Sequence, residues 1–212
     1  DVIWKTKDDK WYNAVYDADC VVTLATTLRK ALNSIGSHKT HIVVRYNNKA
    51  FMMAVCDRLG IENTGELFAL LDKYYKLTKP DFDTKLAALL SAEQLQAFSN
   101  IRDLENNHTS FPEIATYIKP FTDAVRKQLW LLEAIEIVYD PSIVRGLDYY
   151  TGTVFETFID DRKELGSVCS WWAYANLTEF LDPKQSFSGI GWSIGLSRLM
   201  SILVEDYNIT ET

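Results

Sequence analysis

The residues best suited to chemistry lie in one stretch, which starts at Arg145 and reads Arg-Gly-Leu-Asp-Tyr-Tyr-Thr-Gly-Thr-Val-Phe-Glu as far as Glu156. Arg145 comes just before a predicted strand, where a side chain could reach into a cleft at the strand end. Its planar guanidinium can bind a carboxylate or a phosphate through two parallel hydrogen bonds. That suits a reaction in which an amino-acid carboxylate attacks the α-phosphate of ATP, because the guanidinium would stabilise the charge that develops at phosphorus.

Two neighbouring tyrosines follow Arg145 in this stretch. Tyr149 and Tyr150 point to opposite faces of a strand, so only one of them aims into a given pocket. A tyrosine offers an aromatic wall and a hydroxyl, and both suit an imidazole ligand. Gly146 and Gly152 allow close backbone approach or a bulge. The simpler interpretation of the stretch is a buried strand with one exposed arginine.

These twelve consecutive residues resemble the histidine-specific signature of histidyl-tRNA synthetases. A second segment, Gly189-Ile-Gly-Trp-Ser-Ile-Gly-Leu-Ser-Arg-Leu199, resembles motif 3 of class II synthetases, a glycine-rich strand followed by a helix with an arginine. Ordinary packing of a strand against a helix is the alternative for this second segment. The resemblance covers essentially the whole chain and is strongest from Ser142 onward.

The resemblance implies a role for each matching residue. Arg145 would contact the α-phosphate and the histidine carboxylate, and Tyr149 and Tyr150 would help to form the histidine pocket. Arg198 would hold the ATP phosphates, and ATP would lie against the backbone of three glycines, Gly189, Gly191 and Gly195. The family uses ATP with magnesium. We expect no cofactor held in this chain itself, and no residue spacing supports a metal site.

Between the two signatures the sequence departs from the family. Family members carry Gly-Gly-Arg-Tyr-Asp-Asn-Leu, where this chain has Trp-Trp-Ala-Tyr-Ala-Asn-Leu, ending at Leu177. Trp171 and Trp172 replace both glycines, and Ala173 and Ala175 replace both charged residues. Because a tryptophan side chain covers on the order of 150–250 Å², we expect the pair to fill or reshape the histidine and adenylate pocket.

Two interpretations of these tryptophans stay open. In the first, the chain is an engineered fragment in which Trp4, Trp171, Trp172 and Tyr174 form an aromatic interface, since such clusters are typical of protein–protein hot spots. Its partner would be another protein or a second copy, bound through this cluster or through an exposed sheet edge. In the second, the tryptophans only fill volume.

We therefore expect a synthetase-like core fragment that is inactive or severely impaired on its own. The family's motif 1 and motif 2, the latter with an ATP-binding arginine, should precede Asp1, and the anticodon-binding domain should follow Thr212. The alternatives are an engineered binding or self-associating scaffold and a non-catalytic regulatory synthetase-like module. The intact Arg-Gly-Leu-Asp-Tyr-Tyr run beside an altered glycine motif is unusual for the regulatory module.

Composition narrows the function classes further. The chain is 47% hydrophobic and 24% charged, which is typical of a globular protein. Its net charge is −7 and its basic residues are scattered, so tRNA binding by this chain is not expected. No run of eighteen apolar residues is present, the N-terminal residues lack the basic-then-apolar pattern of a signal peptide, and a cytoplasmic protein is expected. Cys20, Cys56 and Cys169 are far apart, which favours buried free thiols.

Hydrophobic patterning predicts an α+β fold, with an antiparallel sheet flanked by helices and a helical insertion. The resemblance implies that this sheet is class II synthetase-like. The predicted core comprises residues 1–61 and 132–212, and the insertion residues 62–131. Strands are expected at Val2–Ile3, His41–Tyr46, Ala134–Asp140, Asp148–Ile159 and Gly166–Trp172. A loop is expected from Lys5 to Asn13, followed by a helix capped by Asp17. A second helix is expected to start at Asn47-Asn48 and run to Leu59, and within the insertion Ser91 to Gln94 reads as a capping box.

Overall fold

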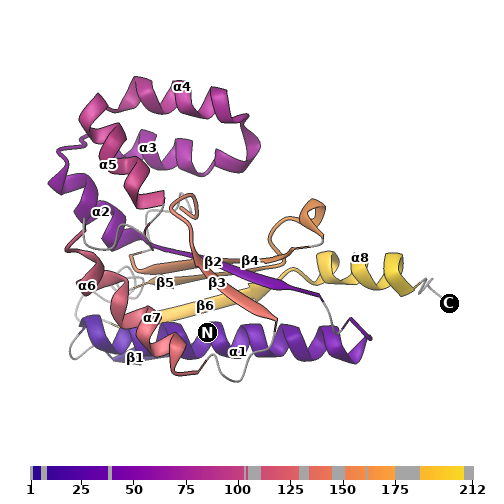
Figure 1. Cartoon of the computed structure of the whole chain (residues 1–212). Helices are drawn as coiled ribbons and strands as arrows, with labels where there is room; N and C mark the ends of the chain where they lie inside the picture. Colours follow the sequence, from indigo (N-terminus) through magenta and orange to yellow (C-terminus); the bar gives the residue numbers. More distant parts are fainter. Residues whose placement is uncertain are drawn as a thin grey trace.

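Six strands form one sheet in the computed structural model of the chain (Figure 1). The structure describes residues 2–5, 9–37, 40–102, 104, 111–128, 134–144, 151–160, 162–174 and 187–207. The strand order is β1-β6-β5-β4-β2-β3. The strands are β1 (Val2–Lys5), β2 (Ile42–Asn48), β3 (Ile135–Tyr139), β4 (Thr153–Ile159), β5 (Cys169–Tyr174) and β6 (Phe187–Ile194).

The sequence predicted an antiparallel sheet, but the observed sheet is mixed. β2 pairs in parallel with β3, in the register Val44 to Ile137, and every other pairing is antiparallel. A parallel pair needs a long crossover connection, and the helices between β2 and β3 supply it. The α+β class is correct, and the predicted antiparallel sheet is wrong at this one edge.

Helices lie on both sides of the sheet (Figure 1). α1 (Asp9–Ser34) and α7 (Lys119–Arg126) lie together along one face. The group α3 (Thr64–Leu71), α4 (Lys79–Leu89) and α5 (Ala92–Arg102) stands on the other side, joined to β2 through α2 (Lys49–Arg58). The remaining helical elements are η1 (Tyr74–Lys76), α6 (Ile114–Tyr117), η4 (Lys163–Leu165) and α8 (Leu196–Tyr207).

α1 begins earlier than its predicted cap. The helix starts at Asp9, inside the stretch expected to be a loop, and Asp17 lies in the helix interior with 2% of its surface exposed. The reason is that Ala14 and Ala18 continue the buried stripe of Val21 and the leucines that follow it. The stripe therefore extends further toward the N-terminus, and the capping role predicted for Asp17 is wrong.

Other local signals are confirmed. Asn48 caps α2, because its Oδ1 accepts a hydrogen bond from the Phe51 amide at 3.0 Å. Ser91 and Gln94 form the predicted capping box, with the Ser91 amide donating to Gln94 Oε1 at 2.9 Å and the Gln94 amide to Ser91 Oγ at 3.3 Å. Gly60 has a φ of +63°, the left-handed conformation that ends the segment after α2.

The predicted insertion contains helices of two kinds. α3, α4 and α5 pack with one another away from the sheet, and we call them the helical subdomain. α7 instead packs on the sheet, where the Phe121 ring lies 4.9 Å from that of Tyr46. Between residues 62 and 128, the described part of the chain contains no strand. The domain boundaries stay a prediction. No described helix is long and apolar enough to cross a membrane.

Candidate functional site

The sheet has an apolar face and a polar face, and the polar one lies toward the helical subdomain. Arg45, Glu156, Ser170 and Ser193 are aligned across β2, β4, β5 and β6, and all are at least partly exposed. The residues that follow each of the first three, namely Tyr46, Thr157 and Trp171, are buried and belong to the opposite face. Successive side chains alternate between faces, so a cleft above this polar row is the natural place for a ligand.

Such a cleft is present. A cavity of about 520 Å³ lies over β2 and β4 and beneath η1. Its floor includes Val43 and Phe158, and its walls carry charges of both signs from Arg45, Lys76, Asp72, Glu156, Asp160 and Arg198. Ligand pockets typically combine an apolar lining with a few convergent polar groups. This open-face pocket therefore suits a small ligand that carries both positive and negative groups.

Arg198 lines the pocket from the first turn of α8. Its Nη1 donates a hydrogen bond to the carbonyl oxygen of Ser167, in the connection between β4 and β5. The guanidinium has further N–H groups beyond that one. The predicted contact with ATP phosphates is thus compatible with this position and stays a prediction.

The three predicted ATP-binding glycines are in two environments. Gly189 and Gly191 are buried within β6, in register with Tyr174 and Trp172 of β5. Gly195 joins β6 to α8, and its amide donates to the Val168 carbonyl at 2.8 Å. A Cβ at Gly195 would lie 3.3 Å from that carbonyl oxygen. Close packing of strand against helix therefore accounts for glycine at position 195 without a ligand.

Trp171 and Trp172 lie on opposite faces of β5. Trp171 is completely buried against the α1 side, with its ring 5.4 Å from that of Phe155. It cannot belong to a surface cluster, so the predicted interface role of Trp171 is wrong, because its strand position points into the core. The prediction that both rings fill or reshape the histidine and adenylate pocket stays a prediction, and of the two rings only Trp172 lies on the polar face.

Trp172 is half-buried on the polar face. It packs against Ile143 and Val154, and it is in register with Gly191 of β6. Ile143 also lines the open-face pocket. Trp172 therefore stands beside the pocket, next to the strand that carries the glycine-rich segment. Ala173 is buried on the Trp171 side of the strand, where a Cβ at Gly152 would lie 3.3 Å from the Ala173 Cβ.

Several predicted site residues lie outside the described residues. These are Arg145, Tyr149, Tyr150 and Ala175, and their predicted roles stay predictions. Of the other proposed interface residues, Trp4 belongs to edge strand β1 in register with Ser188, and Tyr174 ends β5. Only their backbone positions are described.

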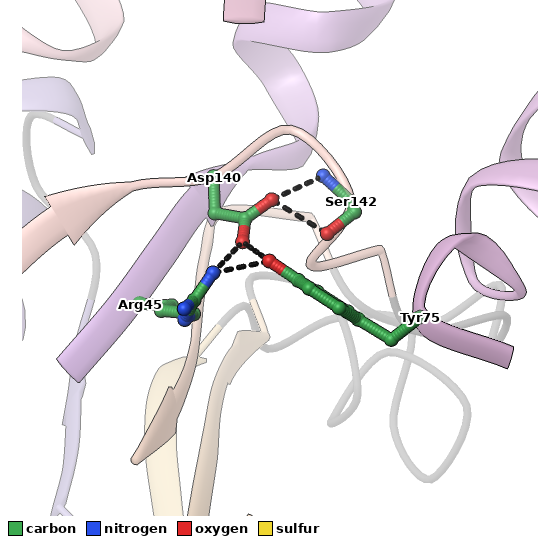
Figure 2. Close-up of polar contacts among 4 residues, drawn as sticks. All are labelled: Arg45, Tyr75, Asp140 and Ser142. Carbon is green, nitrogen blue, oxygen red and sulfur yellow. Dashed lines mark hydrogen bonds and ion pairs between the residues drawn. The ribbon is translucent and has the colours of Figure 1, made fainter. Parts of the chain in front are cut away.

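A polar cluster that was not predicted from the sequence holds the turn at Asp140 to Ser142, shortly before Arg145 in the chain (Figure 2). Asp140 Oδ1 accepts hydrogen bonds from the Ser142 amide at 2.9 Å and the Ser142 hydroxyl at 2.5 Å. Its Oδ2 accepts from Arg45 Nη1 at 2.9 Å and from the Tyr75 hydroxyl at 2.5 Å. The Asp-Pro-Ser sequence was a signal for the local turn, since aspartate readily bonds the backbone two residues on.

Hydrogen bonds also anchor the chain at Gly152 and Thr153. The Lys49 amide donates to the Gly152 carbonyl at 3.0 Å, and Asn48 Nδ2 donates to the Thr153 hydroxyl at 3.3 Å. The Thr153 hydroxyl also bonds the buried carboxylate of Asp17. Burial raises the pKa of Asp17 to about 7, although the bond from Thr153 opposes the shift. Polar contacts thus hold the chain at Asp140 and Ser142, and again at Gly152 and Thr153.

Thiol and metal chemistry have little support in the described part of the chain. Burial raises the pKa of Cys20 and Cys56 to about 11 and that of Cys169 to about 12. All three are buried free cysteines, as predicted. Thiolate is the reactive form, so these side chains have a structural role. Among the described residues, no group of three histidine, cysteine or acidic side chains could hold a metal ion.

Comparison with known proteins points to one family. A sequence model described as histidyl-tRNA synthetase matches residues 17–199. The histidine–tRNA ligase of Clostridium acetobutylicum is 31% identical over 198 residues, covering 84% of this chain and 45% of that protein. The enzyme of Treponema denticola is 34% identical over 192 residues, covering 83% of this chain and 42% of that protein. The chain spans about half the length of these relatives.

Solved structures share the fold. A histidyl-tRNA synthetase from Nostoc sp. PCC 7120 superposes with a TM-score of 0.76 at 23% identity, covering 99% of this chain and 50% of that one. An ATP phosphoribosyltransferase regulatory subunit/histidyl-tRNA synthetase from Bacillus halodurans C superposes with a TM-score of 0.64 at 18% identity, covering 89% and 50%. At these identities the likeness concerns the fold.

Proposed function

Because this chain belongs to the histidyl-tRNA synthetase family, we propose that its open-face pocket binds histidine and is the histidine-binding part of a synthetase catalytic core. One observation carries the proposal. Val144, the residue directly before the signature arginine, and Arg198, from the glycine-rich segment, line the same cavity. Two segments more than fifty residues apart in the sequence thus meet where a ligand would lie.

The pocket chemistry fits an amino acid. An arginine can hold a carboxylate through paired hydrogen bonds, and Arg145 is the proposed donor for it. Glu156 and Asp160 in the pocket wall supply negative charge toward an ammonium or imidazole group. In the family reaction the histidine carboxylate attacks the α-phosphate of ATP, the new bond forms at phosphorus, and pyrophosphate leaves. Such a step needs positioning and charge stabilisation rather than a general base.

We further propose that activation of histidine by this chain is severely impaired. Trp172 lies beside the pocket, where the family carries glycine, and packs on the pocket residue Ile143. A bulky ring there would reduce the space for an adenylate. The exchange of a charged family residue for Ala175 removes a group that could pair with a ligand, whereas Ala173 lies on the face opposite the pocket.

Isothermal calorimetry with histidine and an ATP–pyrophosphate exchange assay test both statements. Histidine binding with little or no exchange is the expected result. Histidine-dependent exchange at an ordinary enzyme rate would contradict the impairment. Absence of binding heat with histidine would contradict the proposed pocket. Leucine, which is apolar and of similar size, serves as the control ligand.

An engineered or self-associating scaffold is the second candidate. The half-buried Trp172 and the edge strand β1 favour it, since edge strands offer unpaired backbone groups to another chain. With Trp171 in the core, the proposed interface is reduced to Trp172, Trp4 and Tyr174. Light scattering after size exclusion would show a dimer under this proposal, and a monomer at high concentration would exclude self-association.

A regulatory synthetase-like module is the remaining proposal, and calorimetry separates it from the scaffold because such a module would still bind histidine. We expect no tRNA binding by this chain, since its net charge is −7. A cytoplasmic location is proposed from the family alone, and bound ATP would bring its own magnesium.

A further inference from the structure

Tyr75 connects the helical subdomain to the sheet. It lies in η1, between α3 and α4, and the residue is 58% exposed. Its hydroxyl nevertheless reaches Asp140 at the end of β3, donating to Oδ2 at 2.5 Å, and accepts a hydrogen bond from Arg45 of β2 (Figure 2). An exposed ring with an engaged hydroxyl indicates that the polar end, rather than apolar burial, holds η1 in place.

Arg45 of β2 strengthens the contact between η1 and the sheet. Its guanidinium lies 5.2 Å from the centroid of the Tyr75 ring and 5.4 Å from that of Phe158. An arginine over an aromatic ring is attracted by the ring's electron density. Because Arg45, Tyr75 and Phe158 all line the open-face pocket, the connection forms part of the pocket wall.

Asp140 is the centre of the cluster. Burial alone would raise its pKa, but hydrogen bonds from Ser142, Tyr75 and Arg45 hold the pKa below its usual value. The carboxylate is therefore charged at neutral pH. Four hydrogen bonds to one charged, largely buried group define its position closely, since charge-assisted bonds are the stronger kind.

Hydrogen bonds also fix the residues that follow Asp140 in the chain. The Ile143 amide donates to the Asp140 carbonyl at 3.1 Å, and the Val144 amide donates to the Ser142 carbonyl at 2.9 Å. Asn47 Nδ2 donates to the Pro141 carbonyl at 3.3 Å. The turn is thus hydrogen-bonded at each step up to Val144, and the next residue in the chain is Arg145.

We propose that Asp140 is a positioning residue for Ser142 to Val144 in the wall of the open-face pocket, and that Tyr75 is the contact through which the helical subdomain sets that position. The pocket walls formed by η1 and by Ser142 to Val144 then move together. A displacement of the subdomain would be transmitted to Val144 through the Tyr75 hydroxyl and the Asp140 carboxylate. The consequence for histidine rests on the proposed function, whereas the mechanical coupling does not.

The test compares Tyr75→Phe, which removes only the hydroxyl, with Tyr74→Phe, which removes the neighbouring hydroxyl outside the cluster. Amide hydrogen exchange of the whole chain is measured by mass spectrometry. We expect peptides covering 141–152 to exchange at least about 3-fold faster in Tyr75→Phe than in the original protein, because their anchor opens more often. Tyr74→Phe should leave those peptides unchanged.

Asp140→Asn and Ser142→Ala extend the series. Asp140→Asn should give the larger acceleration in 141–152, and it should also accelerate exchange in peptides covering η1. If Asp140→Asn does not fold, Ser142→Ala, which removes one of the four bonds, takes its place. Unchanged exchange of 141–152 in Tyr75→Phe overturns the coupling, whatever the stability of the variant.

Histidine calorimetry on the same variants separates the two proposals. We expect Tyr75→Phe to weaken histidine binding roughly 3- to 10-fold, while Tyr74→Phe binds as the original protein does. Binding that is equally tight in all variants overturns the positioning role while leaving the proposed function intact. No binding by the original protein overturns the proposed function, and hydrogen exchange still decides the coupling.

Discussion

Trp171 and Trp172 are neighbours in β5, but their side chains lie on opposite faces of the sheet. Trp171 is completely buried on the apolar face, whereas Trp172 is half-buried on the polar face beside Ile143. The two substitutions at the family's paired glycines therefore have different physical meanings. Trp171 contributes to the core, where its ring lies beside that of Phe155. Trp172 alters the surroundings of the open-face pocket.

The two tryptophans should differ in their effect on stability. Trp171→Ala leaves a large cavity next to Phe155 and is expected to lower the free energy of unfolding by about 3–5 kcal/mol. Trp172→Ala removes a partly exposed ring and should cost less than about 2 kcal/mol. Urea unfolding followed by circular dichroism measures both. Equal losses would contradict the assignment of the two faces.

Trp172 should also control ligand affinity. Trp172→Ala enlarges the space beside Ile143, so we expect histidine to bind about 10-fold more tightly, or about 1.4 kcal/mol, by calorimetry. Trp171→Phe, a change on the opposite face, is the control and should not alter the affinity. Weaker binding by Trp172→Ala would indicate that the indole is itself a ligand contact.

Asp17 should make the protein less stable as the pH rises. The pKa is 3.8 in the unfolded chain and about 7 in the folded one. Because the folded pKa is raised, the stabilisation is complete below pH 3.8, is lost progressively as the pH rises toward 7, and is absent above it. Asp17→Asn should therefore raise the free energy of unfolding by roughly 2–4 kcal/mol at pH 8 and change it little at pH 4.

The matched control for this experiment is Asp19→Asn, on the exposed side of α1, where Oδ1 accepts a hydrogen bond from Gln128 at 2.7 Å. Its effect should stay within about 1 kcal/mol at both pH values. Urea titrations between pH 4 and pH 8 measure both variants. A pH-independent difference between Asp17→Asn and the original protein would show that folding does not raise the pKa of Asp17.

Arg198 should contribute to ATP affinity and little to the stability of the fold. Arg198→Ala removes an exposed guanidinium at the pocket, and we expect ATP to bind roughly 10-fold more weakly with little change in stability. Lys79→Ala removes the same charge from an exposed pair with Asp83 on α4, away from the pocket, and should leave ATP affinity unchanged. Equal weakening by both variants would mean that only net charge matters.

Much of the local structure could be predicted from the sequence because it depends on residues close together in the chain. The Ser91–Gln94 capping box, the Asn48 cap and the turn at Gly60 are each completed within a few residues. The family was likewise evident from a contiguous stretch, Arg145 to Glu156, whose residue types need no partner elsewhere to be identified.

The sequence also predicts that Trp171 and Trp172 lie on opposite faces of a strand. It does not predict which of the two side chains is buried. Only pairing with β4 and packing beside Phe155 in the core decide which face is buried. The same holds for Asp17, which has the residue type of a helix cap and a buried position in α1. The parallel pairing of β2 with β3 depends on how the intervening helices return the chain.

The cluster of Arg45, Tyr75, Asp140 and Ser142 belongs wholly to the tertiary structure. Tyr75 is 65 residues from Asp140 and Arg45 is 95 residues from it, and no pattern in the sequence links them. A hydrogen bond requires its atoms within about 3 Å at a suitable angle. Sequence determines which side chains can form such bonds, whereas only the folded backbone brings three separate segments to one carboxylate.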